Sequence, residues 1–142
     1  MTLVGVTGTN GKTTTTTLLA HLLARRKQGG TLLGLPVVAG KSVVITEEPR
    51  PLWAERIRQL DFGGNVRFIP RPFAHVPTAE EWQSLIGRVA ALHDEHGVDL
   101  AVIDPLARFL RQENLARSML DAVLPLRTLT ERGMAVLALH HP

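Results

Sequence analysis

The chain contains no cysteine and no tyrosine, and aromatic residues make up only 4% of its 142 residues. The absence of cysteine excludes a disulfide framework, a thiolate zinc site and a cysteine nucleophile. Long hydrophobic runs are also missing, because the run at residues 134–139 is far shorter than the roughly 20 residues that cross a bilayer. Residues 1–12 lack the basic start and apolar stretch of a signal peptide. We therefore expect a cytoplasmic protein that does not bind a membrane.

The overall composition is typical of a globular protein. Hydrophobic residues make up 44% and charged residues 20% of the chain, which excludes intrinsic disorder, collagen and coiled coil as descriptions of the whole chain. The length predicts a single domain over residues 1–142, large enough to bury a core without disulfides or a structural metal. The net charge is +3 and most basic residues are arginine. This is a weak indication of an anionic partner, because such an excess usually solvates a surface.

The chain alternates between strand patterns and helix patterns. Five short apolar runs, rich in valine and isoleucine, have the nearly continuous hydrophobicity of parallel strands buried on both faces. These runs occupy residues 3–7, 42–46, 66–69, 100–104 and 134–139. Helix patterns lie between them at residues 12–27, 51–60, 78–96 and 113–132. The alternation predicts an α/β fold, a three-layer α/β/α sandwich around a mainly parallel sheet.

Local signals refine this prediction at four places. Thr78 begins a capping-box pattern at the start of a helix. Pro125 lies inside the last helix pattern and is expected to kink or restart that helix. Residues 28–41 are rich in glycine and are expected to form a long irregular connection. Trp53 and Trp82 both fall in helix patterns and are predicted to line the core or a groove.

The strongest functional signal is GVTGTNGKTT at residues 5–14, a Walker A-type loop directly after the first strand and directly before the first helix. Its glycines allow successive backbone N–H groups to point inward, and these amides and the positive helix N-terminus make a phosphate cradle. In this pattern Lys12 reaches the β- and γ-phosphates, and the Thr13 hydroxyl ligates Mg²⁺. The predicted nucleotide-binding residues are Gly8, Thr9, Asn10, Gly11, Lys12, Thr13 and Thr14. The alternative is a glycine-rich turn with a chance Lys-Thr pair.

Two further strands end in acidic residues. Asp104 closes the strand at residues 100–104 as in a Walker B motif, where the carboxylate holds a water on Mg²⁺. The alternative is an aspartate that serves only the following turn. Glu47 and Glu48 follow the strand at residues 42–46, where a carboxylate can polarise the water that attacks the γ-phosphate. A solvated strand end is the alternative there.

Two more groups of residues suit a nucleotide site or a partner. His140 and His141 end the last strand, where a polar side chain can sense the γ-phosphate; an exposed histidine pair is the alternative. Arg108, Arg111 and Arg117 follow the Walker B strand and suit either a nucleic acid or a neighbouring subunit. A basic surface without a partner is the simpler interpretation of these arginines.

Two family resemblances follow from these motifs. Residues 3–26, with the GVTGTNGKTT loop, resemble the ATP-binding loop of Mur ligases, which add amino acids to peptidoglycan precursors. Residues 30–142 resemble the RepA-type ATPases, a RecA-like family that includes hexameric replicative helicases of plasmids. The pieces that carry this second resemblance are LGLPV (33–37), VITEEP (44–49), LWAER (52–56), residues 99–109, EN (113–114) and LHHP (139–142). Two resemblances in one chain suggest an engineered or truncated chimera, joined near residues 27–30.

The RepA-type resemblance implies roles and a topology. The family's catalytic glutamate stands two residues before the proline, which corresponds to Glu47 rather than Glu48, and its sensing histidine corresponds to His141. The resemblance also implies a RecA-like core with five strands. Their order would be the strand before the phosphate loop, the sensor strand, the Walker B strand, the glutamate strand and the strand at residues 66–69.

Together these features predict Mg²⁺-dependent ATP binding with slow hydrolysis by a minimal RecA-like core. Lys12, Glu47 and His141 are the predicted catalytic residues, and Thr13 and Asp104 are the predicted metal ligands. Hydrolysis in such proteins often needs an arginine from a neighbouring subunit, so a homo-oligomer is an expected partner. Two alternatives stay open, a nucleotide-binding module without turnover and a DNA-dependent, helicase-type ATPase subunit.

Overall fold

The fold was analysed in a computed structural model, which describes residues 3–7, 12–110 and 114–140. Strands and helices alternate along these residues, as the sequence predicts. The elements are β1 (Leu3–Thr7), α1 (Lys12–Arg25), β2 (Gly30–Leu32), β3 (Leu35–Val37), β4 (Lys41–Thr46), α2 (Arg50–Gln59), β5 (Val66–Pro70), α3 (Ala79–His96), β6 (Val98–Asp104), the 3-10 helix η1 (Leu106–Phe109), α4 (Leu115–Glu131) and β7 (Ala135–His140).

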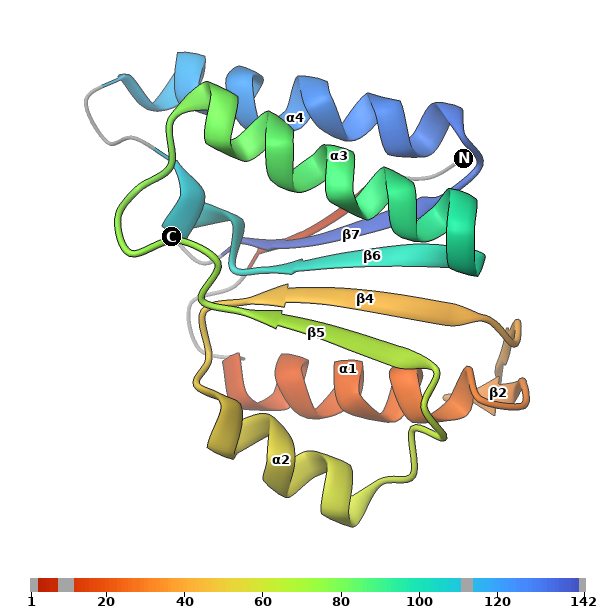
Figure 1. The fold of residues 1–142 in the computed structure, drawn as a ribbon. Coiled ribbons are helices and arrows are strands. Elements are labelled where there is room, and N and C mark those ends of the chain that lie inside the picture. The colour runs from red at the N-terminus through yellow and green to blue at the C-terminus, as the bar shows by residue number, and fades with distance from the viewer. Residues whose placement is uncertain (1–2, 8–11, 111–113, 141–142) are drawn as a thin grey trace.

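The main sheet has five strands in the order β1-β7-β6-β4-β5, and every neighbouring pair is parallel. This order agrees with the one that the RepA-type resemblance implies. Figure 1 shows the arrowheads of β4, β5 and β6 pointing to the side of the molecule on which α1 begins. The carboxyl ends of the strands therefore share one edge of the sheet with the start of α1, the edge at which α/β proteins bind ligands.

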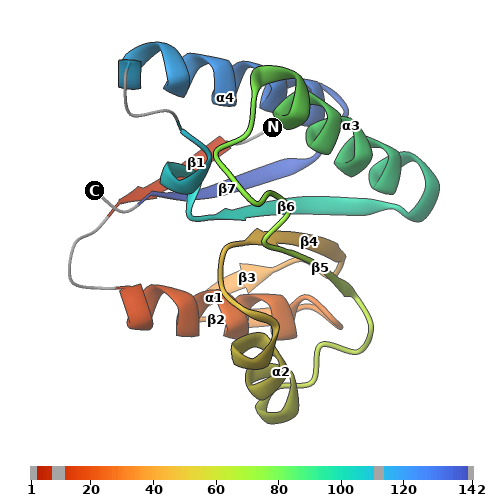
Figure 2. The ribbon, with the colours of Figure 1, turned by 60° about the vertical axis from the view of Figure 1, so that its left-hand side comes forward.

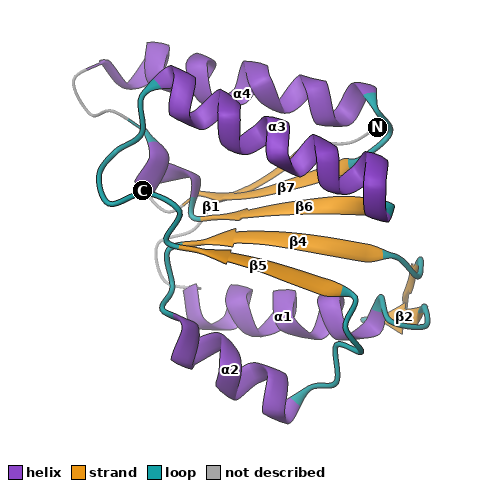
Figure 3. Cartoon of the chain, in the orientation of Figure 1, coloured by secondary structure: helices purple, strands orange, loops and turns teal. Residues whose placement is uncertain are grey.

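Helices cover both faces of this sheet and make three layers (Figure 3). One core cluster joins the sheet to α3 and α4, and a second joins it to α1 and α2. Strand β4 shows the division clearly, because Val43 and Ile45 belong to the first cluster and Val44 to the second. All three side chains are fully buried. The predicted three-layer α/β/α sandwich is confirmed, and the apolar runs are continuous because both faces of each strand are covered.

Trp53 and Trp82 are both core residues, as predicted, with 2% and 3% of their surfaces exposed. Their rings lie in different layers, Trp53 in the cluster under α1 and α2 and Trp82 in the cluster under α3 and α4. The Trp82 indole donates a hydrogen bond to the backbone carbonyl of Ala122 at 2.8 Å. Each tryptophan thus helps to fix a helix against the sheet.

The predicted irregular connection at residues 28–41 is wrong. Strands β2 and β3 pair there as an antiparallel hairpin, with Leu32 opposite Leu35. Leu33 and Gly34 make its two-residue turn, with φ of 50° and 78°. Two positive φ values are what a tight hairpin turn requires. The sequence signal is obscured because leucine stands where asparagine or glycine is usual.

Helix α3 begins as predicted, and α4 is continuous through its proline. Thr78 accepts a hydrogen bond from the backbone N–H of Glu81, and both halves of the capping box are formed. The helix at α4 does not restart at Pro125 but continues through it to Glu131. Pro125 has no N–H for the Asp121 carbonyl four residues earlier, and the Trp82 indole donates to the neighbouring carbonyl of Ala122.

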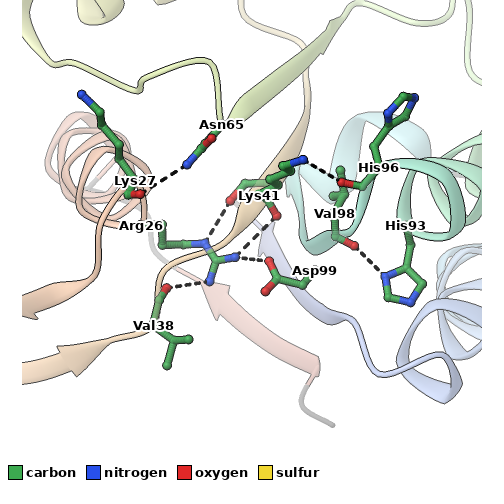
Figure 4. A network of polar contacts seen from close by, with 10 residues as sticks. Arg26, Lys27, Val38, Lys41, Asn65, His93, His96, Val98 and Asp99 are labelled. Carbon is green, nitrogen blue, oxygen red and sulfur yellow. Dashed lines mark hydrogen bonds and ion pairs between the residues drawn. The ribbon is translucent and has the colours of Figure 1, made fainter.

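A dense polar network closes the amino ends of β4 and β6, opposite the edge where α1 begins (Figure 4). Its centre is Arg26, which pairs with Asp99 and donates hydrogen bonds to Ser42 Oγ at 3.1 Å and to the carbonyls of Val38 at 3.3 Å and Lys41 at 3.4 Å. Only 12% of the Arg26 side chain is exposed. The network ties the end of α1 to the start of both strands.

Candidate functional site

The carboxyl ends of β4 and β6 bring two of the predicted acidic residues together. Thr46 pairs with Asp104 in the parallel ladder. One residue further, the backbone N–H of Glu47 donates a hydrogen bond to the carbonyl of Asp104 at 3.0 Å. Asp104 is 2% exposed, and Glu47 is half-buried. The two residues therefore lie side by side at the edge of the sheet, although 57 positions separate them along the chain.

The phosphate-loop prediction is only partly covered by the described residues. Strand β1 ends at Thr7, which pairs with His140 of β7, and α1 begins at Lys12. Figure 2 shows β1 beside β7, with its carboxyl end on the side where α1 begins.

Several predicted site residues lie outside the described part of the chain. Gly8, Thr9, Asn10, Gly11 and His141 are outside it. The backbone of Lys12, Thr13 and Thr14 forms the first turn of α1, and their side chains are not described.

The two glutamates at the end of β4 have different surroundings. The Glu48 carboxylate pairs with both terminal nitrogens of Arg56, and the second contact measures 3.4 Å. The Arg56 guanidinium also lies over the Trp53 ring, 4.6 Å from its centroid. The Glu47 carboxylate has no hydrogen bond or ion pair with any residue in the described ranges. Of the two carboxylates, Glu48 is the one that is paired within the described residues.

The turn that carries these glutamates is fixed by buried groups. Thr46 is fully buried, and its hydroxyl oxygen accepts hydrogen bonds from the backbone N–H of Glu48 at 3.0 Å and from the Trp53 indole at 3.4 Å. On the other side, Arg71 donates from Nε to the carbonyl of Glu47 at 3.0 Å. Sequence patterns do not assign Thr46, Arg56 or Arg71 to this turn. Only Arg56 carries a local signal, since it lies one helical turn after Trp53 on α2.

Three arginines suggested a nucleic acid or a neighbouring subunit. Arg108 and Arg117 are both exposed, and Arg111 lies outside the described residues. Within the described residues no cluster of three or more His, Cys, Asp or Glu side chains could hold a metal ion. Mg²⁺ does not require such a cluster, because it is usually held by one or two carboxylates together with waters and substrate phosphates. The oxygen donors of Asp104 suit it.

Three features together define a protein of the P-loop NTPase type. They are a parallel sheet with this strand order, a strand–GVTGTNGKTT–helix unit, and acidic residues at two neighbouring strand ends. Residues 1–142 match the AAA domain family, and the chain belongs to that family. Membership indicates nucleotide binding and a function of the ATPase type. None of the curated proteins matches the chain. None of the helices in the described parts of the chain combines the length and apolar character needed to span a bilayer.

Proposed function

We propose that the chain binds ATP with Mg²⁺ at the carboxyl edge of its sheet and hydrolyses it slowly. The observation that carries this proposal is the 3.0 Å hydrogen bond from the Glu47 backbone N–H to the Asp104 carbonyl. It joins a candidate base and a candidate metal ligand at the edge where β1 ends and α1 begins. Phosphate binding at such an edge uses backbone N–H groups and the positive end of a helix.

In this proposal the loop residues hold the phosphates and two side chains hold the metal. The amides from Gly8 to Thr14 and the Lys12 ammonium bind the β- and γ-phosphates. The Thr13 hydroxyl and the Asp104 carboxylate hold Mg²⁺, which when bound neutralises charge on the phosphate oxygens. The burial of Asp104 supports this role, because a buried carboxylate interacts strongly with a nearby cation.

Glu47 is the proposed general base for the attacking water. The pairing of Glu48 with Arg56 supports this choice, since Glu48 already has its charge compensated within the fold. His141 is the proposed γ-phosphate sensor. Slow turnover is expected because an arginine that neutralises the transition state often comes from a neighbouring subunit, so we also propose a homo-oligomer as the more active form.

We further propose that the relationship to RepA-type ATPases over residues 30–142 is genuine and that residues 3–26 derive from a Mur ligase-like loop. The strand order supports the first part. A join near residues 27–30 would place the contact between Arg26 and Asp99 across the two segments. In that case residues 1–142 would still act as one domain.

The proposal is tested by titrating the chain with ATP and ADP, with and without Mg²⁺, and following binding calorimetrically. Saturable binding that Mg²⁺ strengthens is expected for ATP. Lys12→Ala should weaken ATP binding by at least about tenfold, because it removes the phosphate-binding cation. Lys41→Ala is the matched control: it removes the same charge from the opposite edge of the sheet, where Lys41 Nζ donates to the His96 carbonyl at 3.0 Å.

Three outcomes would overturn parts of this function. Absence of saturable binding by the unmodified chain, or equal losses in the two lysine variants, contradicts the nucleotide site. Binding without steady release of phosphate contradicts the hydrolysis and leaves a nucleotide-binding module.

A further inference from the structure

Arg71 has an unfavourable backbone conformation at the edge of the proposed site. It directly follows β5 and has φ of 45°, in the left-handed region. Within the described residues Leu33 is the one other non-glycine residue with positive φ. Glycine adopts such a φ without steric cost, whereas a side chain is strained there. Strain of this kind persists where the surrounding structure imposes it, and it gathers at functional sites.

Both hydrogen bonds that Arg71 donates within the described residues go to the end of β4. Its backbone N–H donates to the Thr46 carbonyl at 2.7 Å. Its side-chain Nε donates to the next carbonyl, that of Glu47, at 3.0 Å. One strained residue thus binds two consecutive carbonyls, and the second belongs to the proposed general base.

The Glu47 backbone is held from both neighbouring strands. Its N–H is bound to the Asp104 carbonyl at the end of β6, and its carbonyl is bound by Arg71 at the end of β5. Its carboxylate has no partner among the described residues. A preorganised base needs a fixed backbone and a carboxylate that is not held by other groups. Glu47 meets both conditions within the described residues.

We propose that Arg71 is a positioning residue that fixes Glu47 beside Asp104 for ATP hydrolysis. The inference rests on the proposed function. Arg71 acts through the Glu47 peptide group and needs no contact with the nucleotide. The backbone strain at Arg71 is explained by this role, because glycine would remove the strain but also the Nε donor.

The decisive variant is Arg71→Gly, since it separates strain from function. Removal of the side chain relieves the steric strain of the positive φ, so the melting temperature of the variant should stay the same or rise. Turnover should nevertheless fall by roughly 10- to 100-fold, because the base loses its fixed position. KM for ATP should change by less than about twofold, because an effect confined to the transition state appears in kcat.

Leu33→Gly is the matched control. Leu33 has φ of 50° and is 80% exposed at the tip of the β2–β3 hairpin. The same substitution relieves the same kind of strain there, and it should leave turnover unchanged. Two rescue experiments complete the design: Arg71→Lys should retain part of the activity, and guanidinium chloride at low millimolar concentration should restore part of the activity of Arg71→Gly.

A second measurement tests the inference independently of the rate of ATP turnover. Amide hydrogen exchange at Glu47 should speed up in Arg71→Gly and stay unchanged in Leu33→Gly. Unchanged kcat together with unchanged exchange at Glu47 overturns the positioning role. A loss of kcat that follows only a loss of folded protein, without rescue by guanidinium, also overturns it. Failure of the unmodified chain to bind ATP would contradict the proposed function, and the exchange result would still decide whether Arg71 holds Glu47.

Discussion

The two edges of the central sheet use charge differently. At the amino edge, Arg26 is almost fully enclosed and pairs with Asp99, and Lys41 bonds to a helix carbonyl (Figure 4). At the carboxyl edge, Glu48 is paired with Arg56, but the neighbouring Glu47 carboxylate has no partner among the described residues. The amino edge has its charges committed to holding the fold together. At the carboxyl edge the Glu47 carboxylate has no hydrogen bond or ion pair in the described residues, and a strained backbone lies beside it, an arrangement that suits the proposed site.

The largest predicted effect in this comparison of the two sheet edges is a loss of turnover when the carboxyl edge is changed. Glu47→Gln should lower kcat by roughly 10²- to 10⁴-fold, because the amide cannot accept the proton of the attacking water. The free energy of unfolding should change little, since the Glu47 carboxylate makes no hydrogen bond or ion pair with the described residues that the variant would lose. Phosphate release and urea unfolding measure the two quantities on one preparation.

Glu48→Gln is the control for this prediction, with the same chemical change one residue away. It weakens the ion pair with Arg56, in which about a fifth of each side chain is exposed. A cost of about 1 kcal/mol in stability is expected, with turnover largely retained. If Glu48→Gln abolishes turnover and Glu47→Gln does not, the assignment of the two glutamates is reversed.

The next largest effect is on stability at the amino edge. A β-carbon added at Gly40 would collide with the Arg26 guanidinium and the Asp99 carboxylate. Gly40→Ala should therefore separate this pair and destabilise the protein by about 1–3 kcal/mol. Turnover per folded molecule should stay unchanged, because the disturbance lies at the edge opposite the proposed site. Urea unfolding and phosphate release check both expectations.

Gly87→Ala is the matched control for that substitution. Gly87 lies inside α3, is exposed, and has open space where a β-carbon would be added. The same change should stabilise the helix there by about 0.5–1 kcal/mol. A loss of turnover in Gly40→Ala that exceeds its loss of folded protein would break the comparison, since it would couple the two edges.

The fold could be predicted from the sequence because local and global signals agree. The nearly continuous apolar runs predict strands covered on both faces, and β4 and β6 are buried on both faces. The error at residues 28–41 arises where one residue contradicts its local rule. Leu33 occupies a turn that favours glycine or asparagine.

The candidate site could be predicted only for the residues that stand at the ends of predicted strands. The closeness of Asp104 and Glu47 could be predicted because parallel strands bring their carboxyl ends to one edge. Arg71 was not, because its role depends on a single hydrogen bond to a residue 24 positions away and on a φ that no sequence pattern marks. The contrast between Glu47 and Glu48 likewise depends on Arg56, which the structure alone places against Glu48.

The smallest predicted effect concerns Glu81, and it tests whether another carboxylate near the carboxyl edge contributes to turnover. Glu81 lies in the first turn of α3, and a hydrogen bond from His75, followed by one from the Thr78 backbone N–H, lowers its pKa below the ordinary value of 4.5. A carboxylate with a lowered folded pKa contributes stability above its unfolded pKa and loses that contribution as the pH falls through the folded value.

Glu81→Gln should therefore reduce stability slightly at about pH 7, and its difference from the unmodified chain should shrink as the pH falls below the ordinary value of 4.5. Glu80→Gln, one residue earlier on the same exposed turn, is the control, because Glu80 makes neither of those hydrogen bonds. Turnover should be unaffected by both variants. A fall in turnover in Glu81→Gln alone would mean that the proposed site includes the start of α3 as well as the strand ends. The difference between the amino and carboxyl edges of the sheet would then extend to the helix beside the carboxyl edge.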